Sequence, residues 1–268
     1  IIGYGYHKKC GGDHAEVAAI KDAWQKGNDI KDSIMYVTLE PCTSYGRTPP
    51  CVDIIIKNKI SEVFIGSKDP NSNGINKLRK AGIKVNTGIL EDEAKEVNEI
   101  FFKYIRTKKP FVVLKAAISL DGKIATGSYD SKWISSKKCR DFARKQRDKF
   151  DSILVGINTV LKDDPKLTGT ASNPLRIILD SKLRLPMDSK VLADGNVIVI
   201  TTDLHDERKR KELEDHGVRC LVCGREKVDI DMLLEKLGEQ QITSVLVEGG
   251  LAIATSFFKE KKLDKINF

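Results

Sequence analysis

Several features of other protein classes are missing from this sequence of 268 residues. The longest apolar stretches, such as 153–157, fall far short of the roughly 20 residues that a helix needs to cross a bilayer, so we expect no membrane contact. Low-complexity tracts are absent, and 40% of the residues are hydrophobic, which excludes a disordered chain. At roughly 100–200 residues per domain, the length allows one large domain or two ordinary ones.

A disulfide framework is also missing, because the cysteines are irregularly spaced. We expect reduced thiols in a cytoplasm, with some of them used for metal binding or catalysis. Lys and Arg outnumber Asp and Glu by 46 to 38, a balance that suits phosphorylated small molecules and nucleic acids alike. The one longer basic run, 208–211, falls among acidic residues of a predicted amphipathic helix. We interpret it as a solvated face and expect no nucleic-acid partner.

Short apolar strands alternate with amphipathic stretches, the pattern of a layered α/β protein. A polar break at 106–110, ended by a proline, predicts two domains, 1–108 and 109–268. Asp121-Gly122 is expected to form a hairpin turn. We expect strands at 34–39, 62–66, 111–118, 152–155, 175–179, 197–201 and 244–247, and helices at 15–26, 50–59, 76–81, 91–106, 136–149, 207–216, 231–237 and 251–258.

One histidine, one glutamate and two cysteines stand where a catalytic zinc site can form. His14 and Glu16 flank the start of the first predicted helix, Cys42 follows a predicted strand, and Cys51 opens the next helix. A catalytic zinc takes three protein ligands and a water, whose pKa falls to about 7. Glu16 is placed to carry a proton from that water to a leaving amine. A capping box from Asp13 to Glu16 and buried structural cysteines explain the same residues singly, so only the combination favours zinc.

The spacing of these two cysteines carries more information. Residues 37–51 read VTLEPCTSYGRTPPC, so eight residues separate the cysteines, whereas nucleic-acid deaminases carry a Cys-x-x-Cys pair. This string resembles the deaminase domain of the bacterial bifunctional deaminase/reductase family of riboflavin biosynthesis. The resemblance implies a cytidine-deaminase-like, three-layer N-terminal domain with zinc ligands His14, Cys42 and Cys51, and with Glu16 as acid/base.

The resemblance continues in the second predicted domain, through KAAISLDGK (115–123), SKWI (131–134), DSILVG (151–156), TVLKDDP (159–165) and LVEGG (246–250). It implies a dihydrofolate-reductase-like fold that uses NADPH, although no G-x-G-x-x-G follows any predicted strand. The glycines of LVEGG stand between a strand and a helix, where a phosphate can approach the helix N-terminus.

Residue roles in this domain also come from the resemblance. The residues that it implies for NADPH are Ala117, Trp133, Thr159, Asp163, Thr201 or Thr202, Gly250, Leu251, Ala252, Ile253, Ala254, Thr255 and Ser256. Those implied for the substrate are Ser131, Arg147, Leu167 and Glu248, with Arg147 as a charge-assisted fork on the ribose phosphate. Trp133 could also be a core aromatic. Cys220 and Cys223 are predicted to be structural, because positions three apart in a strand face opposite sides, and Cys10 and Cys139 are interpreted in the same way.

These observations predict two steps of riboflavin biosynthesis. The first is hydrolytic deamination of 2,5-diamino-6-(5-phosphoribosylamino)pyrimidin-4(3H)-one, and the second is reduction of the ribosyl group to ribityl by NADPH, with Lys115, Asp163 or Glu248 as proton donor. Relatives form dimers or larger assemblies, so we expect a homo-oligomer. Family members extend beyond both ends of this sequence, so we expect an incomplete domain at each end. Two alternatives stay open: a reductase with an inactive deaminase-like domain, and an RNA-binding protein on a deaminase scaffold.

Overall fold

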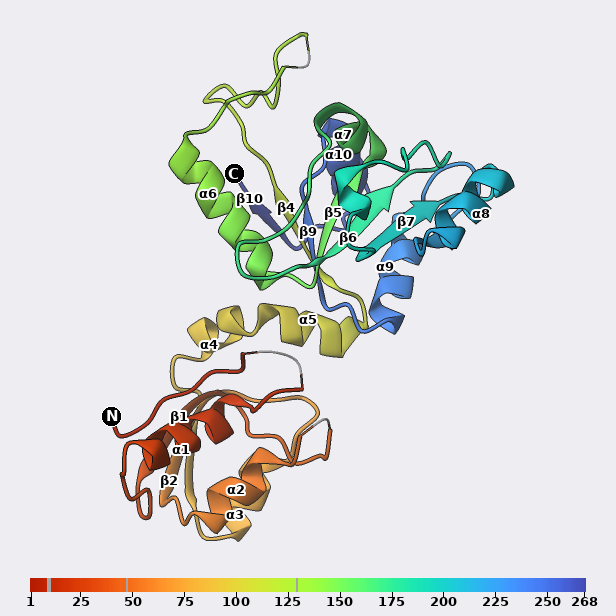
Figure 1. Ribbon diagram of the computed structural model, residues 1–268. Helices are drawn as coiled ribbons and strands as arrows, with labels where there is room; N and C mark the ends of the chain where they lie inside the picture. The colour runs from red at the N-terminus through yellow and green to blue at the C-terminus, as the bar shows by residue number, and fades with distance from the viewer. Residues whose placement is uncertain (9–10, 47, 129) are drawn as a thin grey trace. The chain divides into compact units, whose positions relative to one another are not determined.

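The computed structural model describes residues 1–8, 11–46, 48–128 and 130–268, which form two compact units, Ile1–Glu99 and Ile100–Phe268 (Figure 1). Cys10 therefore lies outside the described residues. The division precedes the polar break at 106–110, because helix α5 (Glu99–Thr107) packs on the second unit. The Tyr104 hydroxyl of α5 donates a hydrogen bond of 2.9 Å to the Gly238 carbonyl.

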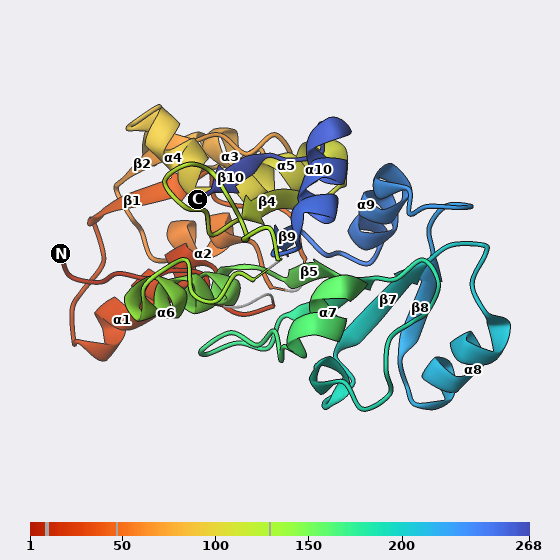
Figure 2. The ribbon, with the colours of Figure 1, turned by 90° about the horizontal axis from the view of Figure 1, so that it is seen from above.

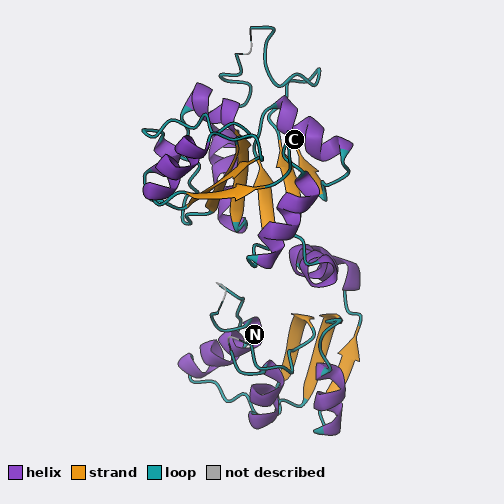
Figure 3. Ribbon diagram, turned by 90° about the vertical axis from the view of Figure 1, so that its right-hand side faces the viewer, coloured by secondary structure: helices purple, strands orange, loops and turns teal. Residues whose placement is uncertain are grey.

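The first unit has three layers around a parallel sheet of order β1-β2-β3, with helices on both of its faces (Figure 3). One face packs on helices α1 to α3 through a core that includes Ile20, Val63 and Leu78. The other face meets α4, where Ala94 packs directly on Gly66. The elements are β1 (Ile34–Leu39), β2 (Glu62–Ser67), β3 (Lys84–Thr87), α1 (Ala15–Gln25), α2 (Cys51–Lys57), α3 (Gly74–Lys80) and α4 (Glu91–Val97).

Two features of this unit differ from the sequence prediction. Strand β3 was missed because its four residues, KVNT, carry only one buried side chain. The helix predicted at 91–106 is divided at Asn98 into α4 and α5. The Asn98 side chain donates a hydrogen bond of 2.7 Å to the Ala94 carbonyl, and its backbone N–H turns to Lys95. A side chain that competes for the helical acceptor in this way ends the helix.

The second unit contains a seven-stranded sheet of order β10-β4-β9-β5-β6-β7-β8, in which every neighbouring pair of the described strands is parallel. Helices α9 and α10 cover one face, and α7 and α8 cover the other (Figure 2). Both faces are buried, which explains the continuous apolar runs of the strands. The strands are β4 (Phe111–Lys115), β5 (Ser152–Gly156), β6 (Leu175–Leu179), β7 (Val197–Thr201), β8 (Arg219–Val222), β9 (Ser244–Val247) and β10 (Lys265–Asn267). The helices that follow α5 are α6 (Lys137–Gln146), α7 (Ile157–Asp163), α8 (Glu207–Asp215), α9 (Ile230–Glu239) and α10 (Leu251–Lys259).

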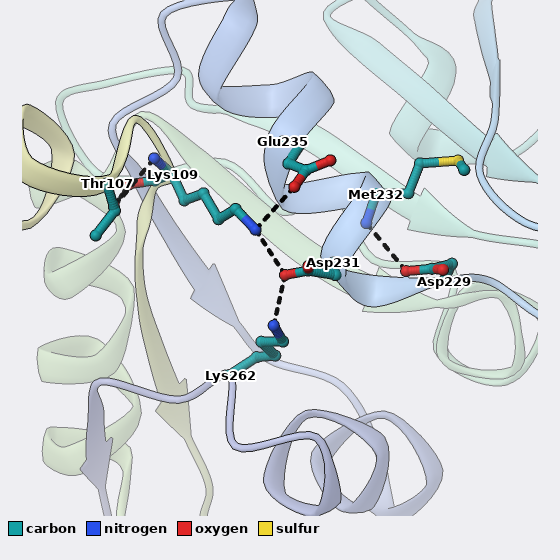
Figure 4. A network of polar contacts seen from close by, with 7 residues as sticks. All are labelled: Thr107, Lys109, Asp229, Asp231, Met232, Glu235 and Lys262. Atoms are coloured by element: carbon teal, nitrogen blue, oxygen red, sulfur yellow. Dashed lines mark hydrogen bonds and ion pairs between the residues drawn. The ribbon is translucent and has the colours of Figure 1, made fainter.

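An ion-pair network joins three segments of this unit (Figure 4). Lys109, just before β4, lies 2.7 Å from Asp231 and 3.0 Å from Glu235, both on α9. Lys262, between α10 and β10, pairs with the same oxygen of Asp231. The network fastens the start of α9 beside the start of β4.

Local predictions in the second unit have mixed outcomes. Gly122 closes a turn by donating to the Ser119 carbonyl at 2.9 Å, with φ at +79°. The predicted hairpin is wrong, because β4 ends at Lys115 and no other described strand begins before β5. Cys220 and Cys223 are buried in cores on opposite faces of the sheet, which confirms their structural role. No described helix has the length and apolarity that a membrane crossing requires.

Candidate active sites

The zinc-ligand candidates of the first unit come together at the starts of two helices. His14 is the N-cap of α1, Cys51 is the first residue of α2, and Cys42 follows β1. His14 Nδ1 lies 3.5 Å from Cys42 Sγ and 3.3 Å from Cys51 Sγ. Tetrahedral zinc, with bonds of about 2.0–2.1 Å to nitrogen and about 2.3 Å to sulfur, separates two such ligand atoms by about 3.6 Å. One imidazole and two sulfurs at these distances fit a zinc ion and leave a fourth position for water.

Hydrogen bonds from neighbouring groups change the pKa values of the two cysteine thiols. Cys42 Sγ accepts a hydrogen bond of 3.3 Å from the Cys51 backbone N–H. A hydrogen bond from the Cys51 thiol lowers the pKa of Cys42 to about 5, and the hydrogen bond from the Cys51 backbone N–H acts in the same direction. The same thiol–thiolate bond raises the pKa of Cys51. Cys42 is thus held as a thiolate, the form that metal binding requires.

Two further residues surround the cluster. Thr48 Oγ1 lies 3.3 Å from His14 Nε2, and when that nitrogen carries the proton and donates to Thr48, Nδ1 stays free for a metal. Thr48 was not among the predicted site residues, although it belongs to the string 37–51 that resembles the deaminase family. Glu16 is 8% exposed, and burial raises the pKa of its carboxyl group. A buried carboxyl beside the ligands, with a pKa raised above its ordinary value, is suited to hold a proton and pass it on.

The second cluster lies at the carboxyl edge of the larger sheet. Strands β5 and β9 are neighbours in the sheet. The strand that follows β5 in the sequence, β6, lies on one side of this pair, whereas the strand that follows β9, β10, lies on the other side. Ligands of open α/β sheets bind at such a switch point. A Cβ at Gly249 would lie 2.7 Å from Ile253 Cβ, so glycine lets the start of α10 approach β9 closely. The segment predicted to hold NADPH, 250–256, comprises the N-cap and first turns of α10.

A buried charge cluster stands at this edge. Glu248, which follows β9, accepts two hydrogen bonds from Arg147, of 2.7 Å from Nε and 2.9 Å from Nη2. Lys115, the last residue of β4, lies 3.4 Å from the same carboxylate. Burial raises the pKa of Glu248, but the bonds from Arg147 and the charge of Lys115 outweigh burial, and the net pKa is lowered. Arg147 Nη1 donates to the Thr168 carbonyl at 3.0 Å, so Arg147 contacts both Glu248 and the loop between α7 and β6 that contains Thr168.

The remaining predicted residues are placed unevenly. Thr159 and Asp163 belong to α7, directly after β5, and Thr201 ends β7, where its buried hydroxyl donates to the Ser181 carbonyl. Ala117, Ser131 and Trp133 lie in the exposed segment between β4 and α6.

Two of these side chains have distinct environments. Trp133 is 69% exposed beneath the Arg140 guanidinium, so the alternative of a core aromatic is wrong. The Leu167 side chain is 3% exposed and packs in the core, and its predicted substrate contact stays a prediction.

One histidine and two cysteines that can hold a metal beside a buried glutamate are typical of zinc-dependent deaminases. A parallel α/β unit whose strand order changes direction is typical of enzymes that bind a nucleotide cofactor. Together they indicate a bifunctional enzyme of deaminase and reductase type. Residues 1–67 match the family model described as the cytidine and deoxycytidylate deaminase zinc-binding region, and residues 110–268 match the RibD C-terminal domain. The chain belongs to the RibD family of riboflavin biosynthesis proteins.

Individual relatives agree with this assignment. The riboflavin biosynthesis protein RibD of Aquifex aeolicus is 44% identical over 274 residues, covering 99% of this chain and 76% of that protein. A crystal structure of a Thermotoga maritima diaminohydroxyphosphoribosylaminopyrimidine deaminase/5-amino-6-(5-phosphoribosylamino)uracil reductase matches with a TM-score of 0.83 and 40% identity, over 97% of this chain and 74% of that one. Acinetobacter baumannii RibD gives 0.84 at 35% identity, over 99% of this chain and 75% of that one.

Family membership decides the main functional question. The protein is an enzyme of riboflavin biosynthesis with deaminase and reductase activities, using zinc in its deaminase domain and NADPH in its reductase domain. The predicted fold class, a cytidine-deaminase-like domain followed by a dihydrofolate-reductase-like one, is confirmed. The main prediction is thereby favoured over a reductase alone and over an RNA-binding protein.

Proposed function

We propose that the first domain, 1–108, deaminates 2,5-diamino-6-(5-phosphoribosylamino)pyrimidin-4(3H)-one, and that the second, 109–268, reduces the resulting 5-amino-6-(5-phosphoribosylamino)uracil. The cluster of His14, Cys42 and Cys51 beside Glu16 carries this proposal, because it supplies both a metal site and a proton carrier. The name of the Thermotoga relative supports the choice of substrates.

In the deaminase step, His14, Cys42 and Cys51 would hold a zinc ion, which would supply a hydroxide near neutral pH. Glu16 takes up one proton of the attacking water and delivers it to the ring nitrogen. It then carries the proton of the newly formed hydroxyl to the leaving amine, so the amino group departs as ammonia and a carbonyl remains. Its buried position and raised pKa keep this proton inside the site. Thr48 fixes the His14 ring through Nε2.

In the reductase step, NADPH held by the segment 250–256 would supply a hydride to C1′ of the ribosyl group, and the ring oxygen must gain a proton as the ring opens. Of the three candidates, we assign this proton to Lys115. Glu248 is unsuited as the acid, because Arg147 and Lys115 hold its pKa low and keep it ionised. Asp163 is an ion-pair partner of Lys132, at 3.4 Å. Glu248 instead orients the Lys115 ammonium group from 3.4 Å away.

The decisive experiment follows ammonia release and NADPH oxidation with each substrate. Glu16→Gln should abolish ammonia release from the diaminopyrimidine and therefore its NADPH consumption, yet oxidise NADPH normally with the deaminated intermediate. Glu62→Gln is a matched control, since Glu62 pairs with Lys84 on the sheet of the same unit. Ammonia release that survives in Glu16→Gln would contradict the assigned role.

We also propose a homo-oligomer that works in the cytoplasm without a nucleic-acid partner. The resemblance to an associating family supports the oligomer, and the scattered basic residues support the absence of RNA. Light scattering tests the first statement. RNA affinity that falls steeply with salt would contradict the second.

A further inference from the structure

The carboxylate of Asp148 is surrounded by donors from a single loop. Asp148 lies in the short 3₁₀ turn Arg147–Lys149 that follows α6. Its Oδ1 accepts bonds from the backbone N–H groups of Thr170, Ala171 and Ser172 at 2.9, 3.1 and 2.9 Å. The Ser172 hydroxyl reaches the same oxygen at 2.8 Å, and the Thr170 hydroxyl donates to Oδ2. Five donors therefore hold the loop 169–172 against this turn.

The same loop also contacts the charge cluster. The residue before the loop, Thr168, accepts a hydrogen bond of 3.0 Å from Arg147 Nη1, while Nε and Nη2 of the same guanidinium donate to Glu248. Arg147 and Asp148 are neighbours in sequence, so the loop is tied to the 3₁₀ turn at two adjacent points. Fixing the loop therefore fixes the carbonyl that orients the guanidinium.

The loop is shaped around the carboxylate. Gly169 lies so close to Asp148 that a Cβ at this position would collide with Oδ1. Consecutive backbone N–H groups that converge on one point favour an anion there. Here the chain itself supplies that anion, and the bonds from the Thr170 and Ser172 hydroxyls lower the pKa of Asp148, so it remains charged at neutral pH.

We infer that Asp148 is a positioning residue of the reductase. It holds the loop 169–172, and with it the preceding Thr168 carbonyl, so that Arg147 meets the substrate in one orientation. The inference rests on the proposed role of Arg147 in substrate binding. It predicts an effect on the affinity for the phosphoribosyl substrate, and none on the cofactor or on the zinc site, because Asp148 contacts neither group's predicted residues.

Steady-state kinetics of the full chain with 5-amino-6-(5-phosphoribosylamino)uracil and NADPH tests this. Asp148→Ala should raise KM for the uracil substrate about tenfold, the scale on which small displacements of binding groups act. The KM for NADPH should change less than about twofold. Ammonia release by the first unit serves as an internal control. Gly169→Ala should reproduce the phenotype, because its methyl group displaces a carboxylate that is still present.

Two comparisons separate positioning from loss of stability. Asp229→Ala removes a carboxylate that caps α9 through the Met232 N–H, away from the cluster, and should leave both KM values unchanged. In an Arg147→Lys background, Asp148→Ala should alter KM by less than about twofold, since residues that act through one another are not additive.

The possible failures are distinguishable. If Arg147→Lys raises KM but Asp148→Ala and Gly169→Ala do not, the inference is wrong and the proposed substrate role of Arg147 stands. If the effects of Asp148→Ala and Arg147→Lys multiply, Asp148 acts independently of Arg147 and the inference is overturned. If none of the variants changes KM, the substrate role of Arg147 fails together with the inference.

Discussion

The charge cluster at the carboxyl edge of the larger sheet makes a quantitative prediction for Glu248→Ala. Removing this carboxylate leaves Arg147 and Lys115 as two cations without their shared partner. Removing one member of a buried ion pair costs about 3–5 kcal/mol. The side chains of Arg147 and Lys115 keep 17% and 26% of their surface exposed, so water relieves part of this cost. We therefore expect a loss of about 3 kcal/mol in the free energy of unfolding of the second unit.

Urea unfolding of the second unit, with thermal unfolding beside it, measures this loss. For a domain of 150–250 residues, a change of about 3 kcal/mol lowers Tm by about 6–12 °C. The double variant Arg147→Met/Glu248→Leu should regain part of the stability, because it removes the Arg147 charge that Glu248→Ala leaves unpaired, while Lys115 stays without its partner. A loss below about 1 kcal/mol, or a double variant no more stable than Glu248→Ala, would refute the reasoning.

The pH dependence follows from the same cluster. The folded-state pKa of Glu248 lies below its ordinary value of 4.5. The carboxylate therefore stabilises the fold above the unfolded pKa, and this contribution is lost as the pH falls through the lower folded value. Glu248→Ala should flatten the acid limb of the stability curve below about pH 4.5. An unchanged acid limb would mean that Glu248 is not the group that titrates.

Two further predictions concern other sites. Cys42→Ser should lower the zinc content measured by elemental analysis and abolish ammonia release, while NADPH oxidation with the deaminated intermediate continues; full zinc occupancy in this variant would exclude Cys42 as a ligand. Asp180, at the end of β6, is buried, and burial raises its pKa. The contribution of Asp180 to stability is therefore fully present below the unfolded pKa and is lost as the pH rises through the higher folded pKa. Asp180→Asn keeps an acceptor for the Leu185 N–H and should raise the urea midpoint at pH 7, whereas a lower midpoint would show that the charge is needed.

Much of the fold follows from local patterns in the sequence. Strands β5, β6 and β7 carry the apolar runs 153–155, 177–179 and 197–200 because both faces of the sheet are covered, and such runs are recognisable without any tertiary information. The three candidate zinc ligands were also recognisable, because His14 and Cys51 stand at helix starts and Cys42 follows a strand. The strand signals span only a few residues each, whereas the metal-site signal is the combination of residues spread between positions 14 and 51.

Strand β3 and helix α7 were missed because each is short, and short segments show too little periodicity for recognition. The predicted helix is divided at Asn98 because the Asn98 side chain donates a hydrogen bond to the Ala94 carbonyl, which the sequence pattern does not reveal. The cofactor-binding and substrate-binding residues of the reductase came from family resemblance, because no phosphate-binding motif marks them in the sequence.

The sequence by itself determined the α/β class, and its motifs predicted two domains and the zinc ligands His14, Cys42 and Cys51. Tertiary structure alone decided that Arg147 forks onto Glu248, 101 residues away, and that Asp148 holds the loop 169–172. The physical reason is that helix and strand signals repeat over a few neighbouring residues, whereas a charge selects its partner only after the sheet order brings distant strand ends together. That order places β9 beside β4, and so it sets Lys115, the last residue of β4, next to Glu248, whereas Arg147 reaches Glu248 from the 3₁₀ turn after α6.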